Sequence, residues 1–512
     1  MKYLSTRDAS LRKNAAEVIA QGLSREGGLF TPEIFPVMPE GFLEKLMPMT
    51  YQQRAVEVMS LYLDDFTKEE LAGFAEKAYR LGEKFDTPAV APVYHLTEGT
   101  EILELWHGPT CAFKDMALQM LPHLLTASLR KNGETRTACI LVATSGDTGK
   151  AALEGFCDVD QTRILVFYPK DGVSDIQKLQ MVTQKGENVG VCAVIGNFDD
   201  AQTGVKQIFS DEAIRETLNE RGLFLSSANS INWGRVLPQV VYYISAYCDL
   251  VRDGRITMGQ EINFCVPTGN FGDILAGFYA KTMGLPVKTL ICASNSNNVL
   301  TDFIETGVYD RNRPFYTTAS PSMDILISSN LERLIYQLSG SDEQVRGYMD
   351  ALNTTGRYEV SDALKEKIQQ NFAAGWCSDQ AAADSIAKVF GTEGYLMDTH
   401  TAVAYTVLEQ YREKTGDDTL SVVLSTASPY KFCASVLEAM GRLLHPSENP
   451  RRQGCVRRRQ EPQHQPRLHP CNSLRHQPRH HRQGRQGGQV THLPPRSKKV
   501  PGDSFTQNRF PG

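Results

Sequence analysis

The sequence lacks long apolar runs and any cysteine arrangement typical of a metal site or disulfide framework. No stretch approaches the roughly 20 apolar residues that a membrane span needs. The first fifteen residues have no apolar signal-peptide core. Eleven cysteines are scattered without a C-x-x-C pair or a Cys/His cluster at zinc-ligand spacing. These absences predict a cytoplasmic protein with reduced thiols, no resident metal and no membrane contact.

The chain has little net charge, −5, but this average conceals two unlike parts. Residues 447–512 contain 14 Lys and Arg against three acidic residues, a net charge of +11, which leaves −16 for residues 1–446. We expect residues 446–512 to form a disordered basic tail, since a segment rich in Arg, Gln, His and Pro buries too little apolar surface to offset its ordering entropy.

Three interpretations of this tail compete. It could be an inert extension, an electrostatic nucleic-acid-binding arm, or an out-of-frame translation product. Its abrupt onset and its low Glu content favour the last, so that nucleic acid is not the expected partner.

The remaining sequence divides into two parts, within the two to four domains that 512 residues suggest. Residues 1–95 contain short helical segments separated by Gly and Pro, which predicts an N-terminal helical lobe. Residues 96–445 alternate short apolar or β-branched runs, such as TACILVATSG, TRILVFYP, EINFCVPTGNFG and SVVLSTASPYKF, with helix-length segments. This alternation predicts an α/β fold with a parallel sheet covered by helices on both faces.

Lys114 is a candidate imine-forming lysine. It lies in HGPTCAFKD, where small and aromatic residues surround it. This segment follows the apolar run EILELW. Desolvation lowers the pKa of such an amine, and enclosure protects an imine from hydrolysis. An isolated A-F-K sequence is also compatible with a solvated loop lysine.

Each of two turns lies between a predicted strand and the helix that follows it. Proteins often bind anions at this position. ATSGDTGK follows CILV, and its hydroxyls and helix N-terminus could bind a carboxylate or phosphate, or could only cap the helix. PTGNFGD follows INFCV, and its two glycines let the backbone approach a phosphate. Neither turn matches the P-loop or the Rossmann fingerprint.

Two further polar clusters are candidate ligand-binding segments. SSANSINWGR precedes an apolar helix, and its Asn, Ser and Arg donors suit a phosphomonoester, although a loop with a helix cap would have the same residues. STASP ends the last predicted strand, where its hydroxyls could meet a heteroaromatic nitrogen.

In this order the segments resemble the threonine synthase family over about residues 20–440. HGPTCAFKD, ATSGDTG, YPKDGVSDIQKLQM, SSANSINWGR, PTGNFGD and SPSMDI carry the resemblance. It implies the pyridoxal-phosphate fold type II, an α/β parallel-sheet fold with two α/β subdomains. To this fold we add the N-terminal helical lobe and the disordered basic C-terminal tail.

The resemblance also implies roles for individual residues. Lys114 would form a Schiff base with pyridoxal 5'-phosphate and then move protons. The cofactor would also contact Gly269, Asn270, Phe271, Gly272, Asp273, Thr426 and Asp147, the last standing where relatives often have an Asn facing the ring hydroxyl. The substrate α-carboxylate would contact Thr144, Ser145 and Thr148, and its phosphate Ser230, Asn232 and Arg235. Ser428 lies where many relatives have His, so the resemblance gives it no role.

The implied reaction converts O-phospho-L-homoserine and water to L-threonine and phosphate. A related phospholyase or dehydratase would use Lys114 identically but release 2-oxobutyrate. A truncated homologue would bind the cofactor without activity. The sequence leaves the oligomeric state open between a monomer and a homodimer.

Overall fold

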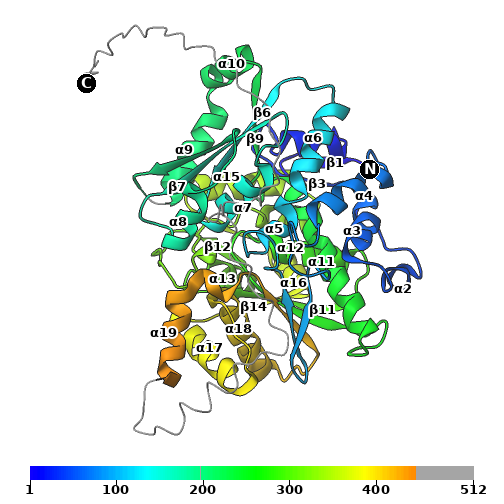
Figure 1. Cartoon of the computed structure of the whole chain (residues 1–512), viewed down its shortest axis with the longest axis vertical. Helices are drawn as coiled ribbons and strands as arrows, with labels where there is room; N and C mark the ends of the chain where they lie inside the picture. The colour runs from blue at the N-terminus through cyan, green and yellow to red at the C-terminus, as the bar shows by residue number, and fades with distance from the viewer. Residues whose placement is uncertain (197, 445–512) are drawn as a thin grey trace, which may run out of the picture. The chain divides into compact units, whose positions relative to one another are not determined.

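A six-stranded sheet forms the core of the larger α/β part, and two of its strands, β11 and β14, are labelled in Figure 1. The strand order is β14, β11, β10, β15, β5, β4. The computed structural model describes residues 1–196 and 198–444, so the expected tail at 446–512 lies outside the described residues. Neighbouring strands are parallel, except that β4 runs antiparallel to β5. The strands are β4 (Val93–Thr97), β5 (Thr100–Glu104), β10 (Ile262–Pro267), β11 (Val287–Ser294), β14 (Phe372–Trp376) and β15 (Ser421–Ser425).

This sheet is buried on both faces. Along β10, Phe264 and Val266 belong to one hydrophobic core, whereas Cys265 between them belongs to another. Along β15, Val422 and Val423 divide between the two cores in the same way. Helices therefore cover both faces, which explains why these strands are continuous apolar runs in the sequence.

A second, four-stranded parallel sheet forms the smaller α/β part, in the order β8, β7, β6, β9. Its strands are β6 (Thr137–Ala143), β7 (Thr162–Pro169), β8 (Val189–Val194) and β9 (Leu223–Ser227). Helices α7 (Asp147–Phe156) and α9 (Phe198–Ser210) pack on β6 and β7. With α8 (Asp175–Val182) and α10 (Glu212–Glu220), they surround this sheet in the upper half of Figure 1. The predicted α/β fold with two α/β subdomains is confirmed.

Several of the remaining helices pack against the six-stranded sheet, and the others pack on neighbouring helices. The long helix α11 (Trp233–Arg252) is buried along almost its whole length and contacts α12 (Gly272–Thr282) and α5 (Lys114–Leu118). The helix α18 (Thr399–Thr415) packs along β10, β11, β14 and β15. The others are α6 (Leu121–Lys131), α13 (Val299–Thr306), α14 (Leu331–Ser339), α15 (Asp342–Thr354), α16 (Asp362–Gln369), α17 (Asp379–Glu393) and α19 (Cys433–Leu444), with short 3-10 helices η1 (Pro321–Met323) and η2 (Pro429–Phe432) and the two-stranded sheet β12 (Val308–Asp310) and β13 (Arg357–Glu359).

The N-terminal lobe is not wholly helical. It contains α1 (Ala15–Gln21), α2 (Phe42–Leu46), α3 (Tyr51–Ser60) and α4 (Lys68–Ala78), and also a three-stranded antiparallel sheet of β1 (Tyr3–Ser5), β2 (Asp8–Lys13) and β3 (Phe30–Pro32). The expected boundary at residue 95 falls within β4. Side chains of the lobe such as Tyr3 and Tyr62 share one hydrophobic core with the α/β part, which explains why no linker separates them.

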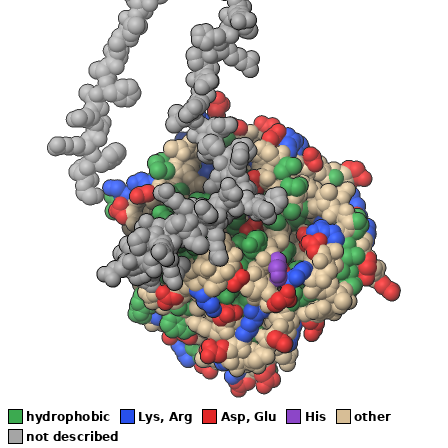
Figure 2. Space-filling model, turned by 60° about the horizontal axis from the view of Figure 1, so that its bottom comes forward, with side chains coloured by type: hydrophobic (Ala, Val, Ile, Leu, Met, Phe, Trp, Pro, Cys, Tyr) green, Lys and Arg blue, Asp and Glu red, His purple; other side chains and the backbone are tan. Residues whose placement is uncertain are grey.

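Charged side chains of both signs are interspersed on the face shown in Figure 2. No helix among the described residues is long and apolar enough to span a membrane. Residues 1–196 and 198–444 also contain no group of three or more His, Cys, Asp or Glu side chains that could hold a metal ion.

Candidate active site

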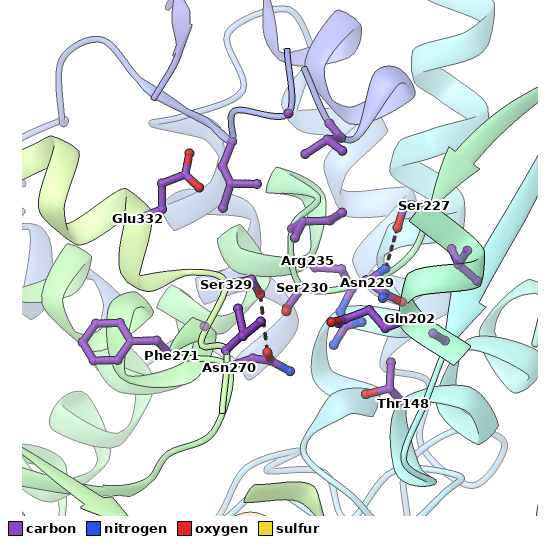
Figure 3. A pocket seen from close by; sticks show the side chains of 18 of the residues that line it. Thr148, Gln202, Ser227, Asn229, Ser230, Arg235, Asn270, Phe271, Ser329 and Glu332 are labelled. Atoms are coloured by element: carbon purple, nitrogen blue, oxygen red, sulfur yellow. Dashed lines mark hydrogen bonds between the residues drawn. The ribbon is translucent and has the colours of Figure 1, made fainter. Parts of the chain in front are cut away.

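A cavity of about 1680 Å³ collects the predicted site residues from both α/β parts. They lie at the carboxyl ends of strands or at the helix starts that follow, the usual place for ligands in parallel sheets. Figure 3 shows Arg235, Ser230 and Asn229 in the middle of the cavity, with Thr148 on one side and Asn270 on the other. All the predicted site residues line this cavity except Asn232.

Lys114 is the first residue of α5 and is held against the end of β15. The amide of Phe113 donates to the Thr426 carbonyl at 2.8 Å, and Ala112 forms an isolated β-bridge with Ala427. The Lys114 Nζ lies 4.5 Å from the centroid of the Phe113 ring, and its side chain is only 11% exposed. The predicted aromatic, desolvated surroundings are therefore present.

Burial lowers the pKa of Lys114 to about 8. The nearby cations Lys431 and Arg235 lower it further, whereas the Asp147 carboxylate, whose Oδ2 is 3.8 Å from Nζ, opposes the shift. With this pKa about a tenth of the amine is unprotonated at pH 7, and this form can act as a nucleophile or base.

The segment that leads into Lys114 is anchored by His107. Its Nδ1 lies 2.7 Å from Asp86 Oδ1, and its Nε2 lies 2.9 Å from Glu104 Oε2. Burial lowers the pKa of the His107 imidazole, but these two carboxylates outweigh burial and raise it to about 9. His107 is therefore a buried imidazolium at neutral pH, bound by a carboxylate at each ring nitrogen.

Asp147 opens α7 and is the most heavily bonded side chain of the site. Its Oδ1 lies 2.7 Å from Lys431 Nζ and accepts a hydrogen bond from Gln177 Nε2 at 3.0 Å. Its Oδ2 accepts from Ser322 Oγ at 3.1 Å. Burial alone would raise the pKa of this carboxyl, but the cations Lys431 and Lys114 hold it well below its usual range. Asp147 is thus a buried carboxylate.

The turn before α7 is shaped to present amides to the cavity. Thr144 Oγ1 accepts from the amides of Gly146 and Gly149, both at 2.9 Å, so its hydroxyl holds the turn together. Gly146 has φ +137°, and a Cβ there would come within 2.4 Å of the Gln177 side chain. Ser145 and Thr148 line the cavity beside the start of α7, where the amides of Asp147 and Thr148 have no hydrogen-bond acceptor within the described part of the chain.

The loop Gly269–Gly272 forms a cradle on the opposite wall. The carbonyl of Gly269 accepts from Ser328 Oγ at 2.8 Å, and that of Asn270 accepts from the Asn330 amide at 3.1 Å. Within the described residues the amides of Gly269, Asn270 and Phe271 have no carbonyl partner. Phe271, at φ +61°, turns the chain into α12. Ser328 and Asn330 therefore hold two carbonyls of the loop, while its amides remain available to bind an anion.

The side chain of Asp273 is hydrogen-bonded to α11 and does not take part in the anion site that the loop amides form. Its Oδ1 accepts hydrogen bonds from the hydroxyls of Tyr242, at 2.5 Å, and Tyr243, at 2.8 Å. Burial raises the pKa of its carboxyl to about 6, although the two tyrosines oppose the shift. Asp273 is thus tied to α11, and its backbone belongs to the first turn of α12.

Arg235 is a buried guanidinium without a carboxylate partner among the described residues. It is 3% exposed, and its Nη1 donates to the Ala228 carbonyl at 2.6 Å, while its Nε has no hydrogen-bond partner in the described part of the chain. Burial lowers its pKa to about 10, so it remains charged at neutral pH. A buried, unpaired cation that lines a cavity indicates an anionic ligand.

Asn232 does not reach the cavity. It is the N-cap of α11: its Oδ1 accepts from the Gly234 amide, and its Nδ2 donates to the carbonyls of Ile19 and Ser227. The expectation that it binds substrate phosphate is therefore not supported by its position. Ser230, from the same segment, does line the cavity.

Thr426 and Ser428 follow β15 and differ in position. Thr426 lines the cavity, as expected for a hydroxyl that meets a cofactor ring. Ser428 is 1% exposed and does not line it, and its Oγ has no hydrogen-bond partner within residues 1–196 and 198–444. The amide of Ser428 donates to the Cys111 carbonyl at 3.1 Å, which joins this turn to the loop before Lys114.

Four side chains around Asp147 were not predicted from the sequence. Lys431, Ser322 and Gln177 bind its carboxylate, and His400 accepts a hydrogen bond from the Ser322 amide at 3.2 Å. His400 is itself held by Asp398, whose Oδ1 lies 2.8 Å from its Nδ1. The SPSMDI and PYKF segments contain Ser322 and Lys431, but nothing in either segment alone indicates that Asp147 is the partner.

Comparison with known proteins agrees with this arrangement. Family models match residues 2–79 (threonine synthase N terminus), 102–426 (pyridoxal-phosphate dependent enzyme) and 401–468 (threonine synthase, C-terminal). Threonine synthase of Schizosaccharomyces pombe is 37% identical over 466 residues, which cover 85% of this chain and 88% of that protein. The chain belongs to the threonine synthase family.

Relatives of this family differ in length. Threonine synthase-like 1 of Homo sapiens is 43% identical over 437 residues, 83% of this chain. The matched region spans 58% of that relative's length. The similarity therefore concerns a little over half of the human protein.

Solved threonine synthase structures confirm the pyridoxal-phosphate fold type II. The pyridoxal-phosphate-bound threonine synthase of Brucella melitensis has a TM-score of 0.79 at 38% identity and covers 86% of this chain and 91% of that one. The yeast threonine synthase has a TM-score of 0.78 at 33% identity, with 88% and 91% covered.

The cavity fits pyridoxal phosphate, the cofactor of this family. The amides of Gly269, Asn270 and Phe271, which have no carbonyl partner among residues 1–196 and 198–444, could bind its phosphate, and the desolvated Lys114 amine would suit its carbonyl carbon. Gly269 permits a close approach of the backbone, because a Cβ there would lie 2.9 Å from the Ser322 carbonyl oxygen. Thr426 also lines the cavity, where its hydroxyl would be a neutral partner for the ring nitrogen.

Proposed function

We propose that this protein is a threonine synthase that converts O-phospho-L-homoserine and water to L-threonine and phosphate. The observation that carries the proposal is one cavity with a desolvated lysine and a buried guanidinium that lacks a carboxylate partner among the described residues, Lys114 and Arg235. A phosphorylated amino acid would satisfy both groups. Its amine and α-carbon would lie near Lys114, and its phosphate near Arg235.

Pyridoxal phosphate, when bound, supplies the electron sink for the carbanion at the substrate α-carbon. Lys114 would hold the cofactor through its Nζ. The amides of residues 269–272 would bind the cofactor phosphate, and Thr426 would face the ring nitrogen without protonating it.

The freed amine of Lys114 is the natural base for the α-proton. It is released beside the α-carbon at high effective concentration. With a pKa of about 8, the amine can both accept this proton and return it near neutral pH. The Phe113 ring beside Nζ helps to exclude water from the transfer.

The start of α7 would orient the substrate. Its first-turn amides, with Ser145 and Thr148 beside them, suit the α-carboxylate. From there the rest of the substrate would extend toward Ser230 and Arg235, which lie near one another in the pocket (Figure 3). Orientation of this kind accounts for a large part of many enzymatic rate enhancements.

Arg235 and Ser230 would bind the phosphate and stabilise it as it leaves. Loss of the γ-phosphate after a β-proton is removed concentrates negative charge on the leaving group, where a charged donor in a desolvated site is most effective. Water then adds at the β-carbon, and reprotonation completes threonine. The net charge of −16 over residues 1–446 means that these local donors, and not the global field, attract the anion.

The test is product analysis with the full chain loaded with pyridoxal phosphate. We expect O-phospho-L-homoserine to yield phosphate and threonine in equal amounts. Phosphate with 2-oxobutyrate and no threonine would instead indicate a phospholyase. Release of neither product, with a visible absorbance band that is lost in Lys114→Ala, would indicate a cofactor-binding protein without this activity.

A further inference from the structure

A second buried lysine, Lys431, stands behind Asp147. It lies in η2, after β15, and its side chain is 3% exposed. Its Nζ is 2.7 Å from Asp147 Oδ1 and donates to the Thr110 carbonyl at 2.9 Å. Thr110 belongs to the loop that leads into Lys114. Lys431 therefore joins three segments around the Lys114 amine, although it does not line the cavity.

The contact between Lys431 and Asp147 balances the charges around the Lys114 amine. Asp147 and Asp273 are the acidic groups that act on it, and Lys431 and Arg235 are the basic groups. Asp273 is the weaker acid, because burial raises the pKa of its carboxyl to about 6. Without Lys431, the Asp147 carboxylate would keep one cation within salt-bridge distance in the described part of the chain, Lys114 itself.

The other groups that bind Asp147 cannot take over this role. Gln177 and Ser322 are neutral donors, which can orient the carboxylate but cannot offset its charge. His400 reaches Asp147 only through Ser322 and is already held by Asp398. A fully charged carboxylate next to Lys114 would favour the protonated amine, since an opposite charge stabilises the charged form.

We propose that Lys431 is a positioning residue for the reaction proposed above: it orients the Asp147 carboxylate and offsets its charge, so that the Lys114 nitrogen can release its proton near neutral pH. This inference rests on the proposed function for its catalytic meaning, but its electrostatic content does not depend on which product is formed. Asp147 and Lys431 together act as a pair with no net charge. The pair gives α7 a fixed start without adding a negative field to the cavity.

A purely structural role for Lys431 makes a different prediction. Its bonds to Thr110 and Asp147 also clamp η2 to the neighbouring segments, so its loss would lower Tm in either case. Only the electrostatic role requires the proton affinity of the Lys114 nitrogen to change.

The experiment compares Lys431→Met, Lys431→Arg and the double variant Lys431→Met/Asp147→Asn in the cofactor-loaded full chain. The readouts are the pH midpoint of the visible absorbance change in the absence of substrate, the pH profile of kcat/KM, and Tm. Lys150→Met is the matched control, because Lys150 is a mostly buried lysine on α7 that pairs with Glu154 at 3.1 Å and does not line the cavity.

We expect Lys431→Met to raise both midpoints by about one pH unit, which corresponds to roughly a tenfold loss of kcat/KM at pH 7. Lys431→Arg should keep the midpoint near that of the wild type. The double variant should restore it, because the pair again has no net charge. Lys150→Met should lower Tm without moving either midpoint.

Two results would overturn the inference. One is an unchanged absorbance midpoint in Lys431→Met, and the other is a double variant whose midpoint stays as far shifted as that of the single variant. If Lys431→Met does not fold, the double variant is compared with Asp147→Asn alone. Removal of Lys431 should raise the midpoint between these two variants, and equal midpoints would overturn the inference. Because the absorbance is read without substrate, these outcomes are separate from failure of the threonine synthase proposal, which product analysis alone reports.

Discussion

Replacement of Arg235 by Met tests the phosphate site most directly. Arg235 is buried, charged, and has an Nε without a hydrogen-bond partner in the described part of the chain. Methionine keeps the apolar stem of the side chain and removes only the guanidinium. The substitution also removes a buried charge that has no carboxylate partner within the described residues, so the fold should tolerate it.

The expected effect follows from the strength of a charge-assisted hydrogen bond. Such a bond to a ligand contributes about 1.5 to 3 kcal/mol. At about 1.4 kcal/mol for each factor of ten, kcat/KM for O-phospho-L-homoserine should fall about 10- to 150-fold. Binding of L-homoserine, which has the same α-amine and α-carboxylate but no phosphate, should change much less.

The assay measures phosphate release against substrate concentration, and L-homoserine binding from its competitive inhibition. Arg54→Met is the matched control, since Arg54 is equally buried but pairs with Asp249 at 2.7 Å, away from the cavity. The control should lower Tm and leave the ratio of the two affinities unchanged. Equal weakening of both ligands by Arg235→Met would refute the assignment of Arg235 to the phosphate.

Three further predictions concern the cofactor, the glycine loop and pH. Lys114→Ala should abolish threonine formation while Tm of the cofactor-free chain changes little, because the amine has no short ion pair to lose. Gly269→Ala should weaken pyridoxal-phosphate binding at least several-fold, since its Cβ would meet a backbone carbonyl oxygen at 2.9 Å. Gly73→Ala in α4, where a Cβ meets open space, should instead stabilise the protein by about 0.5 to 1 kcal/mol. The folded-state pKa of His107, about 9, lies above its unfolded value of about 6.5, so its stabilisation is complete below pH 6.5 and is lost as pH rises to 9. His107→Gln should therefore remove up to about 3 kcal/mol of the pH-dependent stability in that window, measured by urea unfolding.

A specific result would contradict each of these three predictions. Threonine formation by Lys114→Ala would show that another group carries the reaction. Unchanged cofactor affinity in Gly269→Ala would mean that the cradle does not need the close backbone approach. Identical pH dependence of unfolding in the wild type and His107→Gln would show that the imidazole is not charged in the folded protein.

The sequence predicted the strands that position the site. The apolar runs at 137–143, 262–267 and 421–425 are β6, β10 and β15, and each precedes a turn that lines the cavity. They were recognisable because strands of a parallel sheet covered on both faces are continuously apolar. The polar turns that follow them were recognisable for a related reason, since such residues are needed where a strand end meets a ligand.

The N-terminal sheet could not be predicted in the same way. Its strands are three to six residues long, and DASLRK in β2 has no buried residue. The pairing that makes them strands joins Tyr3 to Pro32, so it is specified by tertiary contact and not by local pattern.

Lys431 and Asn232 are two residues whose contacts could not be predicted from local sequence. Lys431 follows a proline and a tyrosine in what reads as a surface turn, yet it binds a carbonyl 321 residues earlier in the chain. Asn232 has the residue type of a ligand and the position of an N-cap, and local sequence does not distinguish the two. Long-range neighbours decide both cases.

The place of β15 within its sheet bears on how the protein is made. Although it is the last strand among the described residues, it lies between β10 and β5, where it pairs with both. The strands on either side of β15 therefore leave the ribosome first, and any sheet that they form has a gap at its centre. The gap closes only when residues 421–425 have emerged, which also brings Thr426 and Lys431 to the loop before Lys114. A nascent chain thus cannot assemble a cofactor-competent site early, and a chain that ends before β15 would lack the middle of its sheet as well as one wall of the cavity.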